Sequence, residues 1–227
     1  MIHYHPDTDR LMAFAAGTQP LSQALCISAH LEHCPQCRQL LQRLNHLGSE
    51  MISSLPPARV PEQLKARVMQ TIHEQRQLPT PEATETTPAA PGHSPYVPRC
   101  LRKLVPQGID RLHWKRLSPS IRSARLCSDV DGTQVELIRI KPGGKVARHN
   151  HTGEEITLVL KGAFSDESGI YRAGDIIFRD QRDRLHRPIA SQDSECICLT
   201  AVASPVQLTG WLGRIFNPLI RRSHYTH

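Results

Sequence analysis

The sequence predicts an α+β chain with two domains, a small helical domain at the N-terminus followed by an antiparallel β-barrel or sandwich. Three observations support this prediction. Apolar residues recur at helical spacing over residues 1–77. From residue 99 to residue 227, short β-branched runs alternate with glycine-containing turns. Between them, residues 78–98 are rich in Pro, Thr and Ala and have too few large apolar residues to fold, so we expect a flexible linker.

Four helices are predicted in the first domain, each beginning at a residue that suits a first turn. These residues are Asp7, Pro20, Pro35 and Pro61. Gly17 is expected to end the first helix, and Gly48 is expected to end the third. Four short helices make a thin core, so we expect a bound metal to contribute stability.

The most informative motif of this domain is a histidine followed at short intervals by two cysteines, His30, Cys34 and Cys37. Cys34 precedes the predicted helix start at Pro35, and the positive end of that helix favours thiolates, the form that binds a metal. A redox C-x-x-C pair or two ordinary buried thiols would show the same cysteine spacing. The histidine one turn earlier, in a helical context, favours tetrahedral zinc coordination.

A tetrahedral zinc site needs a fourth ligand, and the N-terminal segment offers His3 and His5. A ligand at His5 would tie the free end of the chain to the junction of the second and third helices. We therefore prefer His5, followed by His3 and then His33.

The motif His30-x3-Cys34-x2-Cys37, with His5 upstream and the run AFAAGT at residues 13–18, resembles the zinc-binding anti-sigma domain of ChrR-type bacterial regulators. The resemblance implies that His5, His30, Cys34 and Cys37 bind Zn²⁺. It also implies that the four-helix unit binds an extracytoplasmic-function sigma factor, as a one-to-one heterodimer, and blocks its access to core RNA polymerase.

The second half of the chain is predicted to consist of short antiparallel strands. Apolar and β-branched residues dominate four segments: 135–140, 156–160, 176–178 and 196–199. Turn sequences such as Pro142-Gly143-Gly144 separate them. Cys196 and Cys198 lie on one predicted strand, and we interpret them as buried strand residues rather than a redox pair.

A second set of potential metal ligands lies in this region: His149, His151, Glu155 and His186. His149 and His151 are two residues apart, so along a strand they point the same way. Glu155 follows a turn and can approach them, whereas Glu154 would face elsewhere. Three imidazoles and one carboxylate suit zinc, manganese, iron or nickel.

This second pattern resembles the two sequence motifs of the cupin family, whose fold is an antiparallel β-barrel or jelly roll. The resemblance implies that these four residues hold Zn²⁺ or another divalent metal. The second motif departs from the family pattern, because Ala173 precedes Gly174 where proline is usual. ChrR-type regulators combine an anti-sigma domain and a cupin domain in this order, so we interpret residues 99–227 as a cupin domain with an amphipathic C-terminal tail.

Charge and composition limit the functional classes. Eight Lys and Arg residues lie in residues 99–125 against Asp110 alone, and without interleaved aromatic residues we interpret them as a solvated basic face rather than a DNA contact. Seven cysteines, an odd number, and the lack of a signal segment favour a reducing, cytoplasmic setting. No apolar run approaches the length needed to span a bilayer.

The leading hypothesis is a cytoplasmic anti-sigma factor, not an enzyme, whose cupin domain governs release of the sigma factor. The resemblance implies singlet oxygen or organic hydroperoxides as the stress. The alternative is a metal-dependent cupin enzyme, a dioxygenase or isomerase, with the helices as an oligomerisation module. Direct DNA binding through the basic segment is a third hypothesis, and it predicts strongly salt-dependent association.

Overall fold

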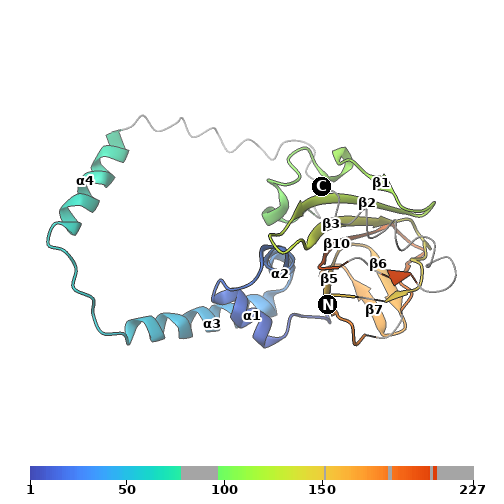
Figure 1. The fold of residues 1–227 in the computed structure, drawn as a ribbon, viewed down its shortest axis with the longest axis horizontal. Coiled ribbons are helices and arrows are strands. Elements are labelled where there is room, and N and C mark those ends of the chain that lie inside the picture. The colour runs from blue at the N-terminus through green and yellow to red at the C-terminus, as the bar shows by residue number, and fades with distance from the viewer. Residues whose placement is uncertain (78–96, 151, 184–185, 205–206, 209–227) are drawn as a thin grey trace.

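The structure is a computed structural model, and it describes residues 1–77, 97–150, 152–183, 186–204 and 207–208. Helices at the N-terminus, which we call the helical region (residues 1–77), lead to a body of β-sheets that we call the barrel (Figure 1). Most of the predicted linker and the predicted C-terminal tail lie outside the described residues.

All four predicted helices are present. They are α1 (Thr8–Ala15), α2 (Leu21–His33), α3 (Pro35–Ser53) and α4 (Leu64–Gln77). The Asp7 carboxylate caps α1, because it accepts a hydrogen bond from the backbone N–H of Arg10 at 2.8 Å. After α1 the chain turns at Gly17, whose φ of 69° lies in the left-handed region that glycine adopts without strain.

The prediction that Gly48 ends the third helix is wrong, because α3 continues to Ser53. Gly48 does not adopt a positive φ, and no proline follows it before Pro56, so the helical hydrogen bonds continue through this position. The second half of α3 therefore extends away from α1 and α2 (Figure 1), and the side chains of Leu47 and Met51 are exposed.

The second helix, α2, joins the helical region to the barrel. It packs against α3 and also against strands β5 (Glu155–Lys161) and β10 (Cys196–Val202). Because neighbours surround it, α2 buries Cys26, Ile27 and Ala29 completely.

The prediction of antiparallel strands is confirmed. The larger sheet has the strand order β1-β2-β3-β10-β5-β8, a second sheet has the order β7-β6-β9, and β11 pairs with β4. The bounds of the other strands are β1 (Lys115–Arg116), β2 (Ile121–Ser128), β3 (Gln134–Ile140), β4 (His149–Asn150), β6 (Ala163–Asp166), β7 (Gly169–Arg172), β8 (Ile176–Arg179), β9 (Ile189–Ala190) and β11 (Gln207–Leu208). Two short 3₁₀ helices, η1 (Arg99–Leu101) and η2 (Ile109–Arg111), precede the strands.

The larger sheet is buried on both faces. On β10, Ile197 and Leu199 belong to the core shared with α2, whereas Cys196 and Cys198 belong to the core inside the barrel. The inner core continues onto the second sheet through residues such as Phe164. A strand buried on both faces is apolar throughout rather than alternating, which explains the continuous run at residues 196–199.

The eight basic side chains of residues 99–125 are all exposed. Among the residues that the structure describes, no helix has both the length and the apolar character needed to cross a membrane.

Two glycines test the packing of the barrel. Gly162 has a φ of 74°, and a Cβ there would clash with the backbone oxygen of Glu195. Gly132 has a φ of 87° but open space around it. We expect Gly132→Ala to lower the free energy of unfolding by about 1–2 kcal/mol through backbone strain, and Gly162→Ala by a further ~1–3 kcal/mol through overpacking. Urea unfolding would measure both losses, and equal losses would contradict the expectation.

Two candidate metal centres

Four potential metal ligands converge where the N-terminal segment, α2 and α3 meet. They are His5, His30, Cys34 and Cys37, and their ligand atoms all lie within 4.8 Å of one another. Three of these side chains are buried and His5 is half-buried. We call this cluster the helical centre. Of the three histidines considered for the fourth position, the structure places His5 in the cluster, whereas His3 and His33 are exposed outside it.

The start of α3 brings the two thiols together. Cys34 caps the helix in an extended conformation, Pro35 occupies the first turn, and the Cys37 N–H donates to Cys34 Sγ at 3.4 Å. His5 Nδ1 lies 3.4 Å from both sulfur atoms, and His30 Nε2 lies 3.3 Å from Cys37 Sγ. Each imidazole therefore presents one nitrogen to the thiols.

The surroundings of the helical centre favour a neutral imidazole and make thiolates unfavourable unless a cation is present. Burial lowers the pKa of His30 to about 4, so its ring is neutral at pH 7 and carries a lone pair that a metal can bind. Burial and the hydrogen bond with Cys34 raise the pKa of Cys37 to about 12. Two thiolates can share this site only if a cation balances their charge. Two imidazoles and two thiolates are the donor set of soft or borderline divalent ions, so the residues fit such an ion.

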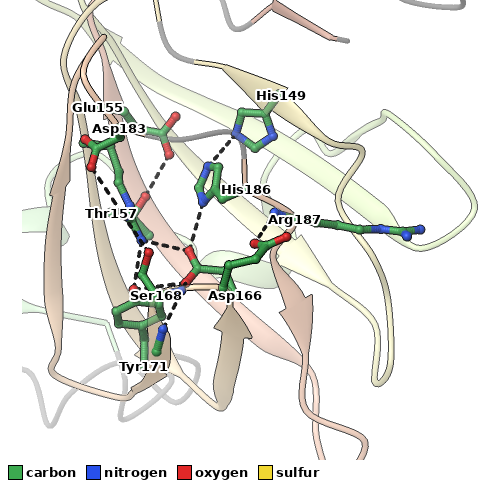
Figure 2. Close-up of polar contacts among 12 residues, drawn as sticks. His149, Glu155, Thr157, Asp166, Ser168, Tyr171, Asp183, His186 and Arg187 are labelled. Atoms are coloured by element: carbon green, nitrogen blue, oxygen red, sulfur yellow. Dashed lines mark hydrogen bonds and ion pairs between the residues drawn. The ribbon is translucent and has the colours of Figure 1, made fainter. Parts of the chain in front are cut away.

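The second candidate site lies in the barrel, where two buried histidines face each other (Figure 2). The Nε2 atoms of His149 and His186 are 3.1 Å apart. The other ring nitrogen of each histidine has a partner: His149 Nδ1 bonds the Ala147 carbonyl at 2.8 Å, and His186 Nδ1 bonds Asp166 Oδ2 at 2.9 Å. We call these two histidines, with the predicted ligands His151 and Glu155, the barrel site.

The hydrogen bonds assign the tautomers of the two histidines. Burial alone would raise the pKa of Asp166, but the hydrogen bonds from His186 and the Ser168 N–H and the charge of Arg179 hold it below its ordinary value, so Asp166 is ionised. A carboxylate and a carbonyl can only accept, hence both Nδ1 atoms carry the proton. In the neutral rings, two Nε2 lone pairs then face each other across 3.1 Å, an arrangement that is favourable with a cation or a proton between them. The pair therefore fits a metal ion.

Of the other two predicted ligands, the structure describes Glu155 but not His151. Glu155 begins β5, and its carboxylate accepts a hydrogen bond from Thr157 Oγ1 at 3.0 Å. The structure thus brings His149 and His186 into contact and holds Glu155 against its own strand.

Asp166 supports the barrel site and was not predicted from the sequence. Its carboxylate accepts hydrogen bonds from His186, from the Tyr171 hydroxyl at 3.2 Å and from Arg179 at 2.8 Å (Figure 2). The Asp166 side chain is 1% exposed. A carboxylate within a strand is the signal that could have indicated it, because a buried charge is kept where it is paired. Its partner His186 is 20 residues away, which no local pattern shows.

Cys196 and Cys198 lie inside the barrel with their sulfur atoms 3.6 Å apart. The hydrogen bond with Cys196, together with burial, raises the pKa of Cys198. Cys198 is therefore a protonated thiol at neutral pH, as the interpretation of a buried strand residue expects.

Three comparisons relate both halves of the chain to one kind of protein. A family model described as the ChrR cupin-like domain matches residues 105–204. The anti-sigma-E factor ChrR of Cereibacter sphaeroides is 33% identical over 221 residues, which are 97% of this chain and 99% of the relative. The crystal structure of Rhodobacter sphaeroides SigE in complex with the anti-sigma ChrR matches with a TM-score of 0.76 and 31% identity, over 89% of this chain and 100% of the matched chain.

We expect Asp166→Asn to weaken metal binding at the barrel site by about 10–100-fold, because an amide holds the His186 N–H less firmly than a carboxylate does. Asp193→Asn, which alters an exposed carboxylate of the barrel, is the control. Competition of the full chain with a graded chelator, followed by metal analysis, would measure both variants. The helical centre should keep its metal in each. Unchanged affinity of the second metal equivalent in Asp166→Asn would contradict the role given to Asp166.

Proposed function

Because the chain belongs to the ChrR family of anti-sigma factors, we propose that it binds and inhibits an extracytoplasmic-function sigma factor as a one-to-one complex. The observation that carries this proposal is the likeness to an anti-sigma factor over nearly the whole chain, helices and barrel in the same order. The same likeness does not favour the alternative of a metal-dependent cupin enzyme. A sigma factor works with RNA polymerase, so the proposed site of action is the cytoplasm, and no direct DNA contact is required.

Two helices offer the surface that a sigma factor would cover. The apolar face of α4 consists of four exposed side chains: Leu64, Val68, Met69 and Ile72. A second group of exposed apolar side chains lies on the second half of α3 and just after its end: Leu47, Met51, Ile52 and Leu55. Figure 1 shows both segments extending away from the barrel. Exposed apolar surface of this extent is unfavourable in water and is typical of an interaction site.

We propose zinc as the metal of the helical centre. Two histidines and two cysteines form a common donor set of structural zinc sites. The helical region is also too small to gain much stability from its own core. Zinc would join the N-terminal segment to α2 and α3 and would fix the direction in which α3 leaves the body. The sigma-binding face of α3 would then depend on this metal.

The barrel, in this proposal, governs release of the sigma factor under oxidative stress, with singlet oxygen or an organic hydroperoxide as the signal. The residues that would hold Zn²⁺ or another divalent metal there are His149, His151, Glu155 and His186. When bound, the metal would supply a charged cross-link between His186 and the connection from β4 into β5, which we call the β4–β5 loop. A chemical change in one of these side chains would then alter the position of the loop.

Glu154 connects this loop to the helical region and supports the proposal. Glu154 Oε1 lies 2.6 Å from Arg10 Nη2, and Glu154 Oε2 accepts a hydrogen bond from Gln23 Nε2 at 2.7 Å. Arg10 also lies over the Phe178 ring, 4.1 Å from its centroid. Because Glu154 and Glu155 are consecutive, a displacement of Glu155 in the barrel site would act directly on α1 and α2.

A charge on the apolar face of α4 should disrupt sigma binding. Val68 and Ile72 are 48% and 43% exposed. We expect Val68→Asp and Ile72→Asp each to weaken the complex at least about 100-fold, because an unpaired carboxylate would be buried at the interface. Gln70→Asp places the same charge on the opposite face of α4 and should bind normally. Calorimetric titration of each full-length variant against the host's extracytoplasmic-function sigma factors would measure this.

Two results would count against the proposal. Normal binding by Val68→Asp and Ile72→Asp would contradict the proposed surface on α4. The absence of a complex between the wild-type chain and every one of the host's extracytoplasmic-function sigma factors would contradict the proposed function itself.

We expect Glu154→Gln to leave basal sigma binding unchanged and to reduce the fraction of sigma factor released by a given dose of hydroperoxide, because a neutral amide holds Arg10 less strongly. Glu136→Gln, which alters an ion pair with Arg125 within the barrel, is the matched control and should respond normally. Release would be followed by size-exclusion chromatography of the purified complex. A normal response of Glu154→Gln would show that this contact does not transmit the state of the barrel.

A further inference from the structure

The barrel holds the N-terminal arm, which we define as residues 2–6. Asp175 Oδ1 accepts hydrogen bonds from the backbone N–H of His3 at 2.7 Å and of Tyr4 at 3.1 Å. The Ile176 N–H donates in turn to the Tyr4 carbonyl at 3.2 Å. The arm therefore lies along the start of β8 in the manner of a short added strand. The next residue along the arm is His5 of the helical centre.

The Tyr4 side chain also anchors the arm. Its ring packs on Tyr171, with 4.6 Å between the ring centroids, against the inner core of the barrel. The barrel leaves room for this ring at Gly169, where a Cβ would collide with the Tyr4 hydroxyl. The Tyr171 hydroxyl donates to Asp166, the residue that holds His186. The arm thus contacts Tyr171, one of the side chains that donate a hydrogen bond to Asp166.

The turn before β8 contacts a second member of the helical centre. The Gly174 carbonyl accepts a hydrogen bond from His30 Nδ1 at 2.7 Å, while His30 Nε2 faces Cys37 Sγ. Gly174 adopts a φ of 95°, and a Cβ there would lie 2.7 Å from Ile2 Cδ1. The positive φ therefore favours glycine at this position, where the turn lies close to the arm and to His30.

We propose that the barrel turn at residues 172–175 is a positioning element of the helical centre. Gly174 orients the ring of His30 directly, and Asp175 places His5 through the arm. Two of the four ligands therefore depend on the barrel, whereas Cys34 and Cys37 are positioned by the start of α3 itself. This inference rests on the proposed function in one respect, that the helical centre holds zinc.

The physical basis is the cost of ordering a chain end. Residues that precede the first helix have no secondary structure of their own and fray unless something ties them down. Asp175 ties them with a carboxylate that has no exposed surface and accepts three backbone N–H groups, the third from Arg172 at 2.7 Å. A histidine ligand likewise keeps its orientation when its second ring N–H donates a hydrogen bond to a carbonyl or carboxylate, as His30 Nδ1–H does to the Gly174 carbonyl.

The test uses the full-length protein loaded with zinc. Asp175→Asn removes the charge that holds the arm, and Tyr4→Ala removes the ring contact without altering the turn at residues 172–175. Zinc transfer to a chelator would be followed together with alkylation of Cys34 and Cys37, read peptide by peptide because the chain has seven cysteines. Both variants should release zinc and expose these two thiols about 10–100-fold faster than the wild type.

Two substitutions serve as matched controls and should behave as the wild type. His3→Ala removes an exposed side chain from the arm and keeps the backbone N–H that bonds Asp175. Asp131→Asn alters another barrel carboxylate that accepts a backbone N–H, from Thr133 at 2.8 Å, in the turn between β2 and β3. Circular dichroism would identify a variant whose barrel is unfolded. If Asp175→Asn is unfolded, the rates of zinc release and thiol alkylation in Tyr4→Ala decide the outcome.

The outcomes separate this inference from the function on which it rests. If the wild type retains zinc and Tyr4→Ala and Asp175→Asn release it at the same rate as the wild type, the inference is overturned and the helical centre stands. Acceleration by His3→Ala equal to that of Tyr4→Ala would also overturn it, since the contacts with Asp175 and Tyr171 would then not be the cause. If the wild type carries no zinc and its Cys34 and Cys37 react at once, the helical centre itself is wrong and the inference falls with it.

Discussion

The buried ring of His30 lies where the two halves of the molecule meet. One of its nitrogens faces Cys37 of the helical region, and the other donates to Gly174 of the barrel. A polar ring without exposed surface is tolerated only where its nitrogens have partners. The side chain therefore belongs to α2, but its orientation depends on both halves at once. The arm held by Asp175 and the contact between Glu154 and Arg10 reinforce the same junction.

This junction divides the helical region into two functional parts. The arm, α1 and α2 lie against the barrel, where hydrogen bonds and the core shared with the larger sheet hold them. The second half of α3 and α4 extend away and keep their apolar side chains exposed (Figure 1). A partner that covers α3 would thus be bound by a helix whose start carries two of the proposed metal ligands, Cys34 and Cys37. Such an arrangement would connect the proposed sensor to the proposed binding surface through α2 and the start of α3.

Local sequence patterns were sufficient for most elements and for the grouping of His30, Cys34 and Cys37, whereas they left His5 as one of three candidate histidines. Asp7 and Pro35 mark helix starts through contacts within a single turn, and the spacing of His30, Cys34 and Cys37 fixes their proximity for the same reason. The prediction for Gly48 was wrong because a glycine inside a helix costs only about 1 kcal/mol relative to alanine. The helix-forming residues on both sides of Gly48 are sufficient to offset this cost. The roles of Asp166, Asp175 and Glu154 could not be predicted, since their hydrogen bonds join positions 20, 172 and 144 residues apart. Those pairings are decided by tertiary packing, which a periodic pattern does not record.

Glu155 begins β5 and Glu154 directly precedes it, and the contacts of the two carboxylates lie on opposite sides of the larger sheet. Glu155 shares the inner side with Thr157, to which it is bonded, whereas Glu154 shares the outer side with Ile156 and reaches the helices. A single-residue insertion or deletion that shifted the register of β5 would exchange the two carboxylates, so that Glu154 would face the inside of the barrel and Glu155 would face the helices. The register of β5 therefore decides which of the two carboxylates reaches the helices and which one faces the inside of the barrel.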